Sequence, residues 1–310
     1  MKKIGIIGSF VVDLTARTER LPRPGETVKG LSFRAGAGGK GSNQAIAAAR
    51  QGAKLRFSTK IGNDSFSSFC RDAIGNEKNI DASWVFTTDE AETGTALISV
   101  SEETGQNEIV VVPGASCTYS DEDIKALDSM LDGLDYLLMQ LEINNDATEK
   151  LIRKAYGMGI KVILNPAPAY QIAKDLYPML YLVTPNETEA ALLSGMKCTC
   201  EDEERAIASY FASLGVKNTI ITIGRNGIFF SGEGTERRIP NYDLRPVDTT
   251  GAGDAFNGGL LAYLGEGMTL LEAARHAMAV SNISVTRHGT SASMPSREDV
   301  DELIGKYGLL

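Results

Sequence analysis

Short apolar runs alternate with amphipathic segments along most of the chain. Runs rich in branched and aliphatic residues predict buried strands at Lys3–Gly8, Leu55–Ile61, Asp135–Gln140, Lys161–Leu164, Leu180–Thr184 and Thr219–Ile223. Apolar positions at helical spacing predict helices near Ser42–Gln51, Ser65–Gly75, Asp121–Leu131, Ala147–Met158, Glu187–Ser194, Glu201–Leu214 and Leu270–Val285. This alternation favours an α/β fold, in which a doubly wound, mostly parallel sheet carries helices on both faces.

Two regions interrupt the alternation. Thr95–Val100 and Glu108–Val112 are extended runs with no helix between them, and residues 11–33 also lack a helical pattern. Because extended segments without an intervening helix usually pair antiparallel, we expect a small separate sheet that covers a site as a lid. The sequence therefore predicts a single α/β domain over residues 1–310 with a discontinuous β-lid from about 11–33 and 83–112.

Composition and charge argue against some classes of binding partner. A net charge of -9 and a pI of about 5.0 argue against nucleic-acid binding, which needs clustered Lys and Arg. No apolar run approaches the roughly 20 residues that span a bilayer, so we expect no membrane partner. The four cysteines lie at positions 70, 117, 198 and 200, without a second Cys or His pair for zinc. So few cysteines indicate a reduced, cytoplasmic protein.

The stretch from Val247 to Gly259 carries the clearest chemistry. Gly251, Ala252 and Gly253 precede an apolar helical stripe, so we expect them to form the first turn of a helix. Free backbone N–H groups and the helix dipole at such a turn can hold a phosphate, and Asp254 would lie within reach of an attacking hydroxyl. Considered alone, the stretch is more typical of a Gly-rich helix cap with an acidic first turn.

A second glycine-rich segment runs from Arg34 to Gln44. It contains a G-x-G-x-x-G pattern, but about 25 residues separate it from the first strand, which argues against a dinucleotide fingerprint. It also lacks the spacing of a Walker A loop. Glycines here would bring the backbone close to a small polyol, to which Lys40 and Asn43 could donate. The alternative is a tight helix entry with a solvated lysine.

Two further clusters follow predicted strands. Asn186 and Glu189 lie three positions apart at a helix start, so both could hold water around Mg²⁺, although an Asn cap with an acidic first turn explains them as well. The segment from Thr222 to Gly227 ends another strand in a glycine turn. In open α/β sheets ligands bind beyond the carboxyl ends of strands, so these clusters and the Asp254 helix should converge.

The order and spacing of these motifs resemble the ribokinase-like sugar kinases, also called the PfkB family, over essentially the whole chain. Gly38–Gln44 looks like the first family signature, and Asp248–Asp254 looks like the second. The resemblance implies an ATP-dependent kinase that phosphorylates the primary hydroxyl of a small sugar, ribose or a related pentose or deoxypentose. It implies that Asp254 is the base and that the amides of Gly251, Ala252 and Gly253 form the anion hole.

The resemblance also implies the ligand contacts. Sugar contacts would come from Asp13, Gly39, Lys40, Asn43, Glu142 and Asp254. ATP would lie along Asn186, Thr222, Gly224, Arg225, Gly227, Gly253 and Met278, with Mg²⁺ held by Asn186 and Glu189 through water. A monovalent cation, normally K⁺, would bind near Asp248, Thr250, Ser284, Arg287, Gly289 and Ser293.

Val11 departs from the family pattern. The ribokinase branch carries Asn-x-Asp after the first strand, whereas this chain reads Val11-Val12-Asp13, so an amide that would grip a sugar hydroxyl is missing. This favours a deoxysugar or a sugar of different stereochemistry. Met278 stands where relatives tend to have Asn or His, and it can pack on adenine.

Other functions stay open at this point. They are a kinase for another sugar or for a nucleoside, and a non-catalytic sugar-binding regulator with the same fold. Exposed edges of lid strands also suggest a homodimer formed through the lid.

Overall fold

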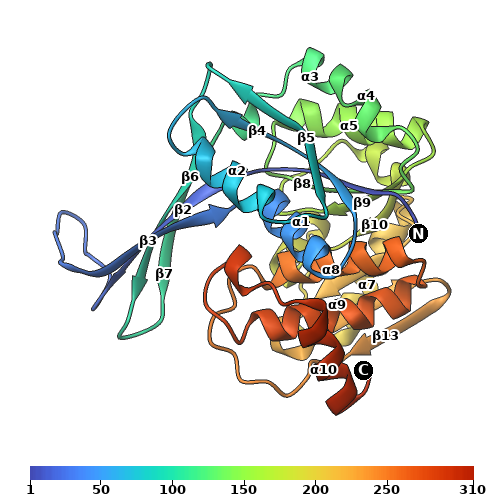
Figure 1. Cartoon of the computed structure of the whole chain (residues 1–310). Helices are drawn as coiled ribbons and strands as arrows, with labels where there is room; N and C mark the ends of the chain where they lie inside the picture. The colour runs from blue at the N-terminus through green and yellow to red at the C-terminus, as the bar shows by residue number, and fades with distance from the viewer.

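A nine-stranded sheet runs through the molecule (Figure 1). The computed structural model describes residues 1–310. The strand order is β13-β12-β11-β10-β9-β8-β1-β4-β5, and all neighbours are parallel except at β12, which is antiparallel to both β11 and β13. The strands are β1 (Ile4–Ile7), β4 (Leu55–Gly62), β5 (Ile80–Thr88), β8 (Tyr136–Gln140), β9 (Lys161–Asn165), β10 (Leu180–Val183), β11 (Thr219–Thr222), β12 (Ile228–Gly232) and β13 (Thr235–Ile239).

Two apolar clusters, one on each face of this sheet, hold the helices. Strand residues alternate between them, since Leu138 belongs to one cluster and Leu137 to the other. The first cluster packs α1 (Lys40–Arg50), α2 (Ser67–Gly75), α8 (Ala252–Glu266), α9 (Leu270–Ser284) and α10 (Arg297–Tyr307). The second packs α3 (Asp121–Ala126), α4 (Asp128–Leu131), α5 (Asn145–Gly157), α6 (Glu187–Ser194) and α7 (Glu201–Ser213). The expected doubly wound fold is confirmed.

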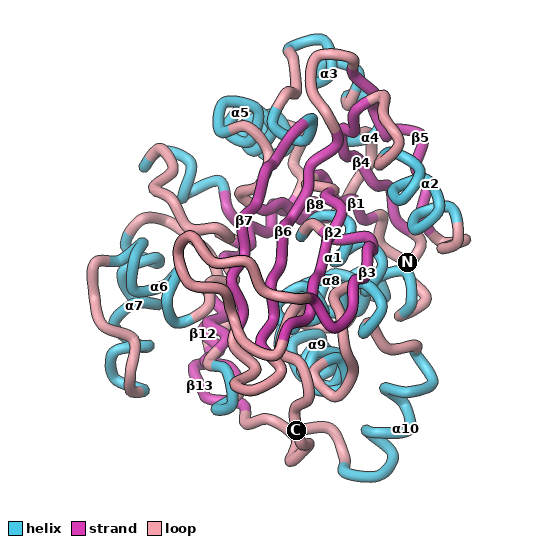
Figure 2. The backbone as a smooth tube through the Cα atoms, turned by 90° about the vertical axis from the view of Figure 1, so that its left-hand side faces the viewer, coloured by secondary structure: helices cyan, strands magenta, loops and turns pink.

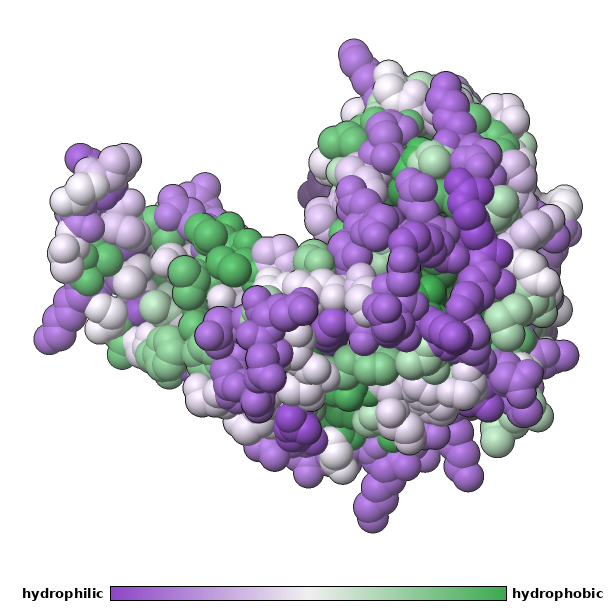
Figure 3. All heavy atoms as spheres, turned by 90° about the horizontal axis from the view of Figure 1, so that it is seen from above, coloured by the Kyte–Doolittle hydropathy of each residue, from purple (hydrophilic) through white to green (hydrophobic).

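A separate four-stranded sheet, here called the lid, extends from the body at the left of Figure 1 and stands apart from it in the space-filling view of Figure 3. Its order is β3-β2-β6-β7, and Figure 2 shows these strands side by side. The pairs β2–β3 and β6–β7 are antiparallel, but β2–β6 is parallel, contrary to the expected antiparallel pairing. The strands are β2 (Val11–Thr18), β3 (Gly30–Gly38), β6 (Thr93–Ser101) and β7 (Asn107–Gly114).

The boundaries of the lid differ from the expected 11–33 and 83–112. The first segment continues to Gly38, and the second begins only at Thr93, because β5 pairs parallel with β4 in the main sheet. Helix α2 connects β4 to β5, so this part of the chain is an ordinary β-α-β unit. The helix expected over Asp121–Leu131 is two short helices, and β12, β13 and α10 were not predicted.

Candidate active site

Helix α8 begins with free backbone donors. Gly251 precedes the helix with a φ of 78°, a left-handed conformation that costs little without a Cβ. The N–H groups of Gly251, Gly253 and Asp254 donate to no group of the chain, whereas the Ala252 N–H, also expected in the anion hole, donates to the Thr249 carbonyl over 3.2 Å. A Cβ on Gly253 would meet nothing within 4 Å, so the turn is open on that side. The turn can therefore accept an anion close to its backbone.

Asp254, in this first turn, is almost fully buried, with 6% of its surface exposed. Two side-chain amides of α1 donate to its carboxylate. Asn43 Nδ2 lies 3.0 Å from Oδ2, and Gln44 Nε2 lies 2.9 Å from Oδ1. Gly258 allows this close packing of α1 on α8, because a Cβ there would lie 2.4 Å from the carbonyl oxygen of Gln44. The orientation of the carboxylate is thus fixed by a neighbouring helix.

Lys40 is the cation among the site carboxylates. Burial disfavours its charge, but Asp254, Glu142 and Glu189 outweigh burial and raise the pKa of its ammonium group. Its backbone N–H donates to Glu142 Oε2 over 2.9 Å, and the Ser9 hydroxyl donates to the same oxygen. The start of α1 and the residues after β8 are therefore joined through one carboxylate.

Asp13 of β2 lies beside the same charges. Burial raises the pKa of its carboxyl to about 6, and the charges of Asp254 and Glu142 add to this rise. A hydrogen bond from Thr290 Oγ1 to Asp13 Oδ2, 3.0 Å long, acts in the opposite direction. Three distant parts of the chain thus meet in one polar region around Asp254: Asp13 of β2, the entry to α1 with Gly39, Lys40 and Asn43, and Glu142 after β8.

A cavity of about 150 Å³ opens at the first turn of α8. Eight of the expected site residues line it: Lys40, Asn186, Glu189, Thr222, Gly251, Ala252, Gly253 and Asp254. The sequence reasoning did not identify the remaining lining residues: Asn165, Ala167, Thr184, Thr249 and Asn257. Several of these follow the buried ends of β9 and β10, and a search for polar residues at strand ends would have found Asn165 and Thr184.

Asn186 and Glu189 form a capping box at the start of α6. Asn186 Oδ1 accepts from the Glu189 N–H over 2.8 Å, and Glu189 Oε2 accepts from the Asn186 N–H over 2.9 Å. The structural alternative therefore accounts for these contacts. However, both residues line the cavity, and Glu189 Oε1 accepts from no donor of the chain. An unpaired carboxylate oxygen beside a polar cavity is a suitable partner for hydrated Mg²⁺.

The glycine turn after β11 lies at the edge of this site. Thr222 forms a bridge with Asn186 and lines the cavity, whereas Gly224, Arg225 and Gly227 form the turn beyond it. Asn241 Nδ2 donates to the Gly224 carbonyl over 2.8 Å and holds the turn.

Met278 lies in α9, with 2% of its surface exposed. It packs in the first apolar cluster and does not line the cavity at the first turn of α8. A contact with adenine stays a prediction.

The residues expected around a monovalent cation lie in the loop before α8 and at the end of α9 with the segment that follows it, and Asp248 connects these two regions. Its carboxylate accepts from the N–H groups of Thr250 and Gly289, each over 3.0 Å. Burial opposes the charge of Asp248, but these donors outweigh burial and lower the pKa of its carboxyl. Arg287 pairs instead with Asp299 of α10 at 2.9 Å.

The hydroxyls of the two buried serines in this set bond locally. Ser284 donates to the Ser281 carbonyl and Ser293 to the Thr290 carbonyl. Carbonyl oxygens of these two regions are the groups left to bind a cation.

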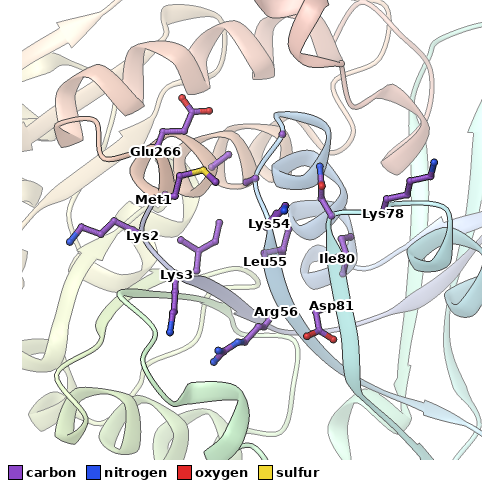
Figure 4. A pocket seen from close by; sticks show the side chains of 16 residues that line it. Met1, Lys2, Lys3, Lys54, Leu55, Arg56, Lys78, Ile80, Asp81 and Glu266 are labelled. Carbon is purple, nitrogen blue, oxygen red and sulfur yellow. The ribbon is translucent and has the colours of Figure 1, made fainter.

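A larger hollow of about 500 Å³ lies at the opposite edge of the sheet, beside the amino ends of β1, β4 and β5 (Figure 4). Lys2, Lys3 and Lys78 line it, but their side chains point outward in different directions. None of the expected site residues contributes to it. Because its charged groups do not converge, we place the active site at the smaller cavity.

No helix of the structure is both long enough and apolar enough to cross a bilayer.

Comparisons with known proteins show the family of the chain. The family model described as pfkB family carbohydrate kinase matches residues 1–297. The chain is 37% identical over 303 residues to a ribokinase of Haemophilus influenzae, with 98% of each chain covered. It is 34% identical over 304 residues to a deoxyribokinase of Salmonella typhi, covering 97% of this chain and 98% of that protein. The structure of Arabidopsis thaliana ribokinase complexed with ribose and ATP matches with a TM-score of 0.88 and 28% identity over 98% of each chain. The chain belongs to the pfkB family of carbohydrate kinases and is an ATP-dependent sugar phosphotransferase.

Proposed function

We propose that this kinase transfers the γ-phosphoryl group of ATP to the primary hydroxyl of a pentose or deoxypentose. The observation that carries the proposal is the position of Asp254, whose carboxylate lines the same cavity as the free amides of its own helix turn. A base and an anion hole therefore face one small space. The ribokinase and deoxyribokinase relatives support a five-carbon substrate.

The reaction needs few protein groups. Asp254 accepts the proton of the attacking hydroxyl, and the amides of Gly251 and Gly253 stabilise the negative charge on the transferring phosphoryl group. Lys40 contributes a fixed positive charge beside the same cavity. Asn186 and Glu189 would hold hydrated Mg²⁺, which supplies charge neutralisation between the phosphates when it is bound. Closure of the lid would exclude water as a competing acceptor.

Val11 favours a deoxysugar as the substrate. It lies two positions before Asp13 in β2, so both side chains are on one face of the lid. Its side chain is apolar, and only 6% of the residue is exposed. A sugar hydroxyl placed against it would stay unpaired at a cost of about 1–3 kcal/mol. A sugar that lacks this hydroxyl would avoid that cost.

A nucleoside kinase and a non-catalytic regulator are the alternatives. A regulator needs no base aligned with an anion hole, and Asp254 and its two amide donors are intact. A nucleoside would need apolar walls for its base. Phe10 is fully buried, and Val11 is the only apolar residue of β2 on the face that carries Asp13.

The deciding experiment measures ADP release with ATP, Mg²⁺ and K⁺ across pentoses, deoxypentoses, hexoses and nucleosides. An Asp254→Asn variant is the control, because it keeps the shape of the side chain and removes the base. We expect turnover with a five-carbon sugar that the control loses. Sugar binding without turnover by the unaltered protein would instead favour the regulator, and substantial activity of the control would exclude Asp254 as the base.

We also propose a monovalent cation in the two regions that Asp248 connects, and K⁺ is the cation we expect. Asp248 already joins the loop before α8 to the loop after α9, so a cation there would stabilise the start of α8. Turnover in K⁺ should exceed turnover in a tetramethylammonium buffer of equal ionic strength. Equal rates in the two buffers would contradict the site.

A homodimer through the lid is the third proposal. Leu97 of β6 pairs with Val110 of β7, and their side chains share the face that also carries Phe33 of β3. These residues are 50%, 61% and 68% exposed. Such an apolar face favours a partner.

Light scattering on the purified protein tests this proposal. Val110→Lys should give a monomer, whereas Ile109→Lys, on the opposite face of β7, should leave the dimer intact. A monomeric unaltered protein at all concentrations would overturn the proposal.

We propose that the protein is located in the cytoplasm, since all four cysteines are free thiols. Fractionation of source cells checks this location.

A further inference from the structure

A buried glutamine lies behind the base. Gln44 of α1 is fully buried and lines neither the active-site cavity nor the larger hollow. Its Nε2 donates to Asp254 Oδ1 over 2.9 Å and to Asn165 Oδ1 over 3.0 Å. Its Oε1 accepts from Gln140 Nε2 over 2.6 Å. All the hydrogen-bonding capacity of this amide nitrogen is used, so the side chain has one orientation.

The partners of Gln44 are rigid. Gln140 and Asn165 are the last residues of β8 and β9, and the two strands pair in register at these residues. Asn165 Nδ2 in turn donates to the Thr184 carbonyl over 3.0 Å. Gln44 therefore connects the carboxyl ends of two central strands to the carboxylate at the start of α8.

Without Gln44, only Asn43 would donate to the carboxylate of Asp254, through the other oxygen. The remaining titratable groups around Asp254 are Asp13 from β2, Lys40 from α1, Glu142 after β8 and Glu189 from α6. Three of these four groups are acids, which disfavour a further negative charge. A second amide donor offsets that repulsion and prevents rotation of the carboxylate.

We propose that Gln44 is a positioning residue for phosphoryl transfer, which holds the Asp254 carboxylate in the orientation and charge state that accept the proton. It acts through Asp254 and contacts no substrate. The inference rests on the proposed role of Asp254 as the base. Asn43, the other donor to Asp254, differs from Gln44 in its expected role, because Asn43 is one of the expected sugar contacts.

The test compares Gln44→Met with Gln51→Met. Both residues are buried glutamines of one helix region, but Gln51 bonds the Pro295 carbonyl and the Tyr263 hydroxyl, away from the base. Methionine keeps the length of the side chain and removes its donors. Gln44→Glu is measured alongside, because it keeps the shape more closely and replaces the donor nitrogen with oxygen.

We expect Gln44→Met to lower kcat about 10-fold or more, with little change in the KM for sugar. The acidic limb of its kcat–pH profile should move to higher pH, since a lost donor favours the protonated acid. Gln51→Met should lower thermal stability without moving the profile. If Gln44→Met misfolds, the same loss of kcat and altered profile in Gln44→Glu carry the test.

Three results distinguish a failure of the inference on Gln44 from a failure of the proposed function. An unaltered kcat and profile in both Gln44 variants, with Asp254→Asn inactive, would overturn the inference alone. Activity in Asp254→Asn would overturn the proposed base as well. If Gln44→Met reduces the residual rate of Asp254→Asn by as much as it reduces the rate of the unaltered protein, Gln44 does not act through Asp254 and the inference fails.

Discussion

Asn43 Nδ2 donates to Oδ2 of Asp254 over 3.0 Å, although the two residues are 211 positions apart in the chain. The other polar atom of this side chain, Oδ1, is buried and accepts no hydrogen bond. A buried acceptor without a donor is costly, and a substrate hydroxyl would satisfy it. Asn43 can thus contact the base and the sugar at the same time.

Asn43→Leu should therefore affect both binding and turnover. We expect the KM for sugar to rise about 10-fold and kcat to fall, while the KM for ATP stays within about twofold. Steady-state kinetics with each substrate varied in turn measure this. A normal KM for sugar with a lowered kcat would show that Asn43 serves the base alone.

Gly258 sets the distance between α1 and α8. Gly258→Ala should destabilise the fold by about 1–3 kcal/mol and lower kcat, because the new methyl would press against the backbone of Gln44 and move both amides away from Asp254. Gly305→Ala is the matched control, since a Cβ at this exposed position of α10 meets nothing within 4 Å. That variant should be neutral or stabilised by up to about 1 kcal/mol. Chemical denaturation measures both, and equal stability of the two variants would contradict the prediction.

Asp13 makes stability depend on pH. Its pKa is about 6 in the folded chain against an ordinary value of 3.8, so the folded state holds the proton more tightly than the unfolded state. Its favourable contribution is complete below about pH 4 and is lost as the pH rises to about 6. Asp13→Asn should therefore raise the Tm more at pH 7.5 than at pH 4.5. The corresponding gain in the free energy of unfolding should be up to about 3 kcal/mol larger at the higher pH.

Thermal unfolding at both pH values checks the Asp13 prediction. The control is Asp72→Asn, at an exposed position of α2, which should change the Tm little at either pH. A stabilisation by Asp13→Asn that does not grow with pH would show that burial of its charge is not the cause. Sugar binding should weaken in the same variant.

Val11 should control the choice between sugars. Val11→Asn adds an amide beside Asp13, so we expect the ratio of kcat/KM for ribose to that for 2-deoxyribose to rise about 10-fold. Val11→Ala removes bulk without adding a donor and should leave the ratio nearly unchanged. A competition assay with both sugars gives the ratio directly. If the asparagine variant ranks the sugars as the unaltered protein does, Val11 is not a specificity residue.

Most of the main sheet could be predicted from hydrophobic runs, because buried parallel strands are short, apolar and bounded by polar turns. The strands near Leu55, Lys161 and Leu180 are examples. In contrast, β12 was missed because only three consecutive residues, Ile228 to Phe230, are apolar before Ser231 and Gly232. Strand β13 was missed because it lies at the edge of the sheet and carries Glu236, Arg237 and Arg238, where burial constrains the sequence least. The start of the lid was misplaced because β5 is only half buried and its pattern does not reveal its partner.

The site could be predicted only in part. The glycines and Asp254 were found because an unusual helix start has a local pattern, and strand-end rules placed Asn186 and Thr222 nearby. Gln44, Asn165 and Thr290 act through partners that are distant in the chain. No local pattern specifies which buried amide will meet which carboxylate, since that depends on how α1 packs against α8.

The packing of α1 against α8 also constrains the order of events during synthesis of the protein. Strand β1 lies between β4 and β8 in the sheet, and β8 leaves the ribosome about 130 residues after β1. Helix α1 stays exposed for longer, because α8, which packs against it, follows it in the chain by about 200 residues. Until α8 emerges, the nascent chain therefore has an incomplete core, and the amides of Asn43 and Gln44 lack the Asp254 carboxylate as a partner. Catalytic competence and the burial of the first apolar cluster are reached in the same late step of translation.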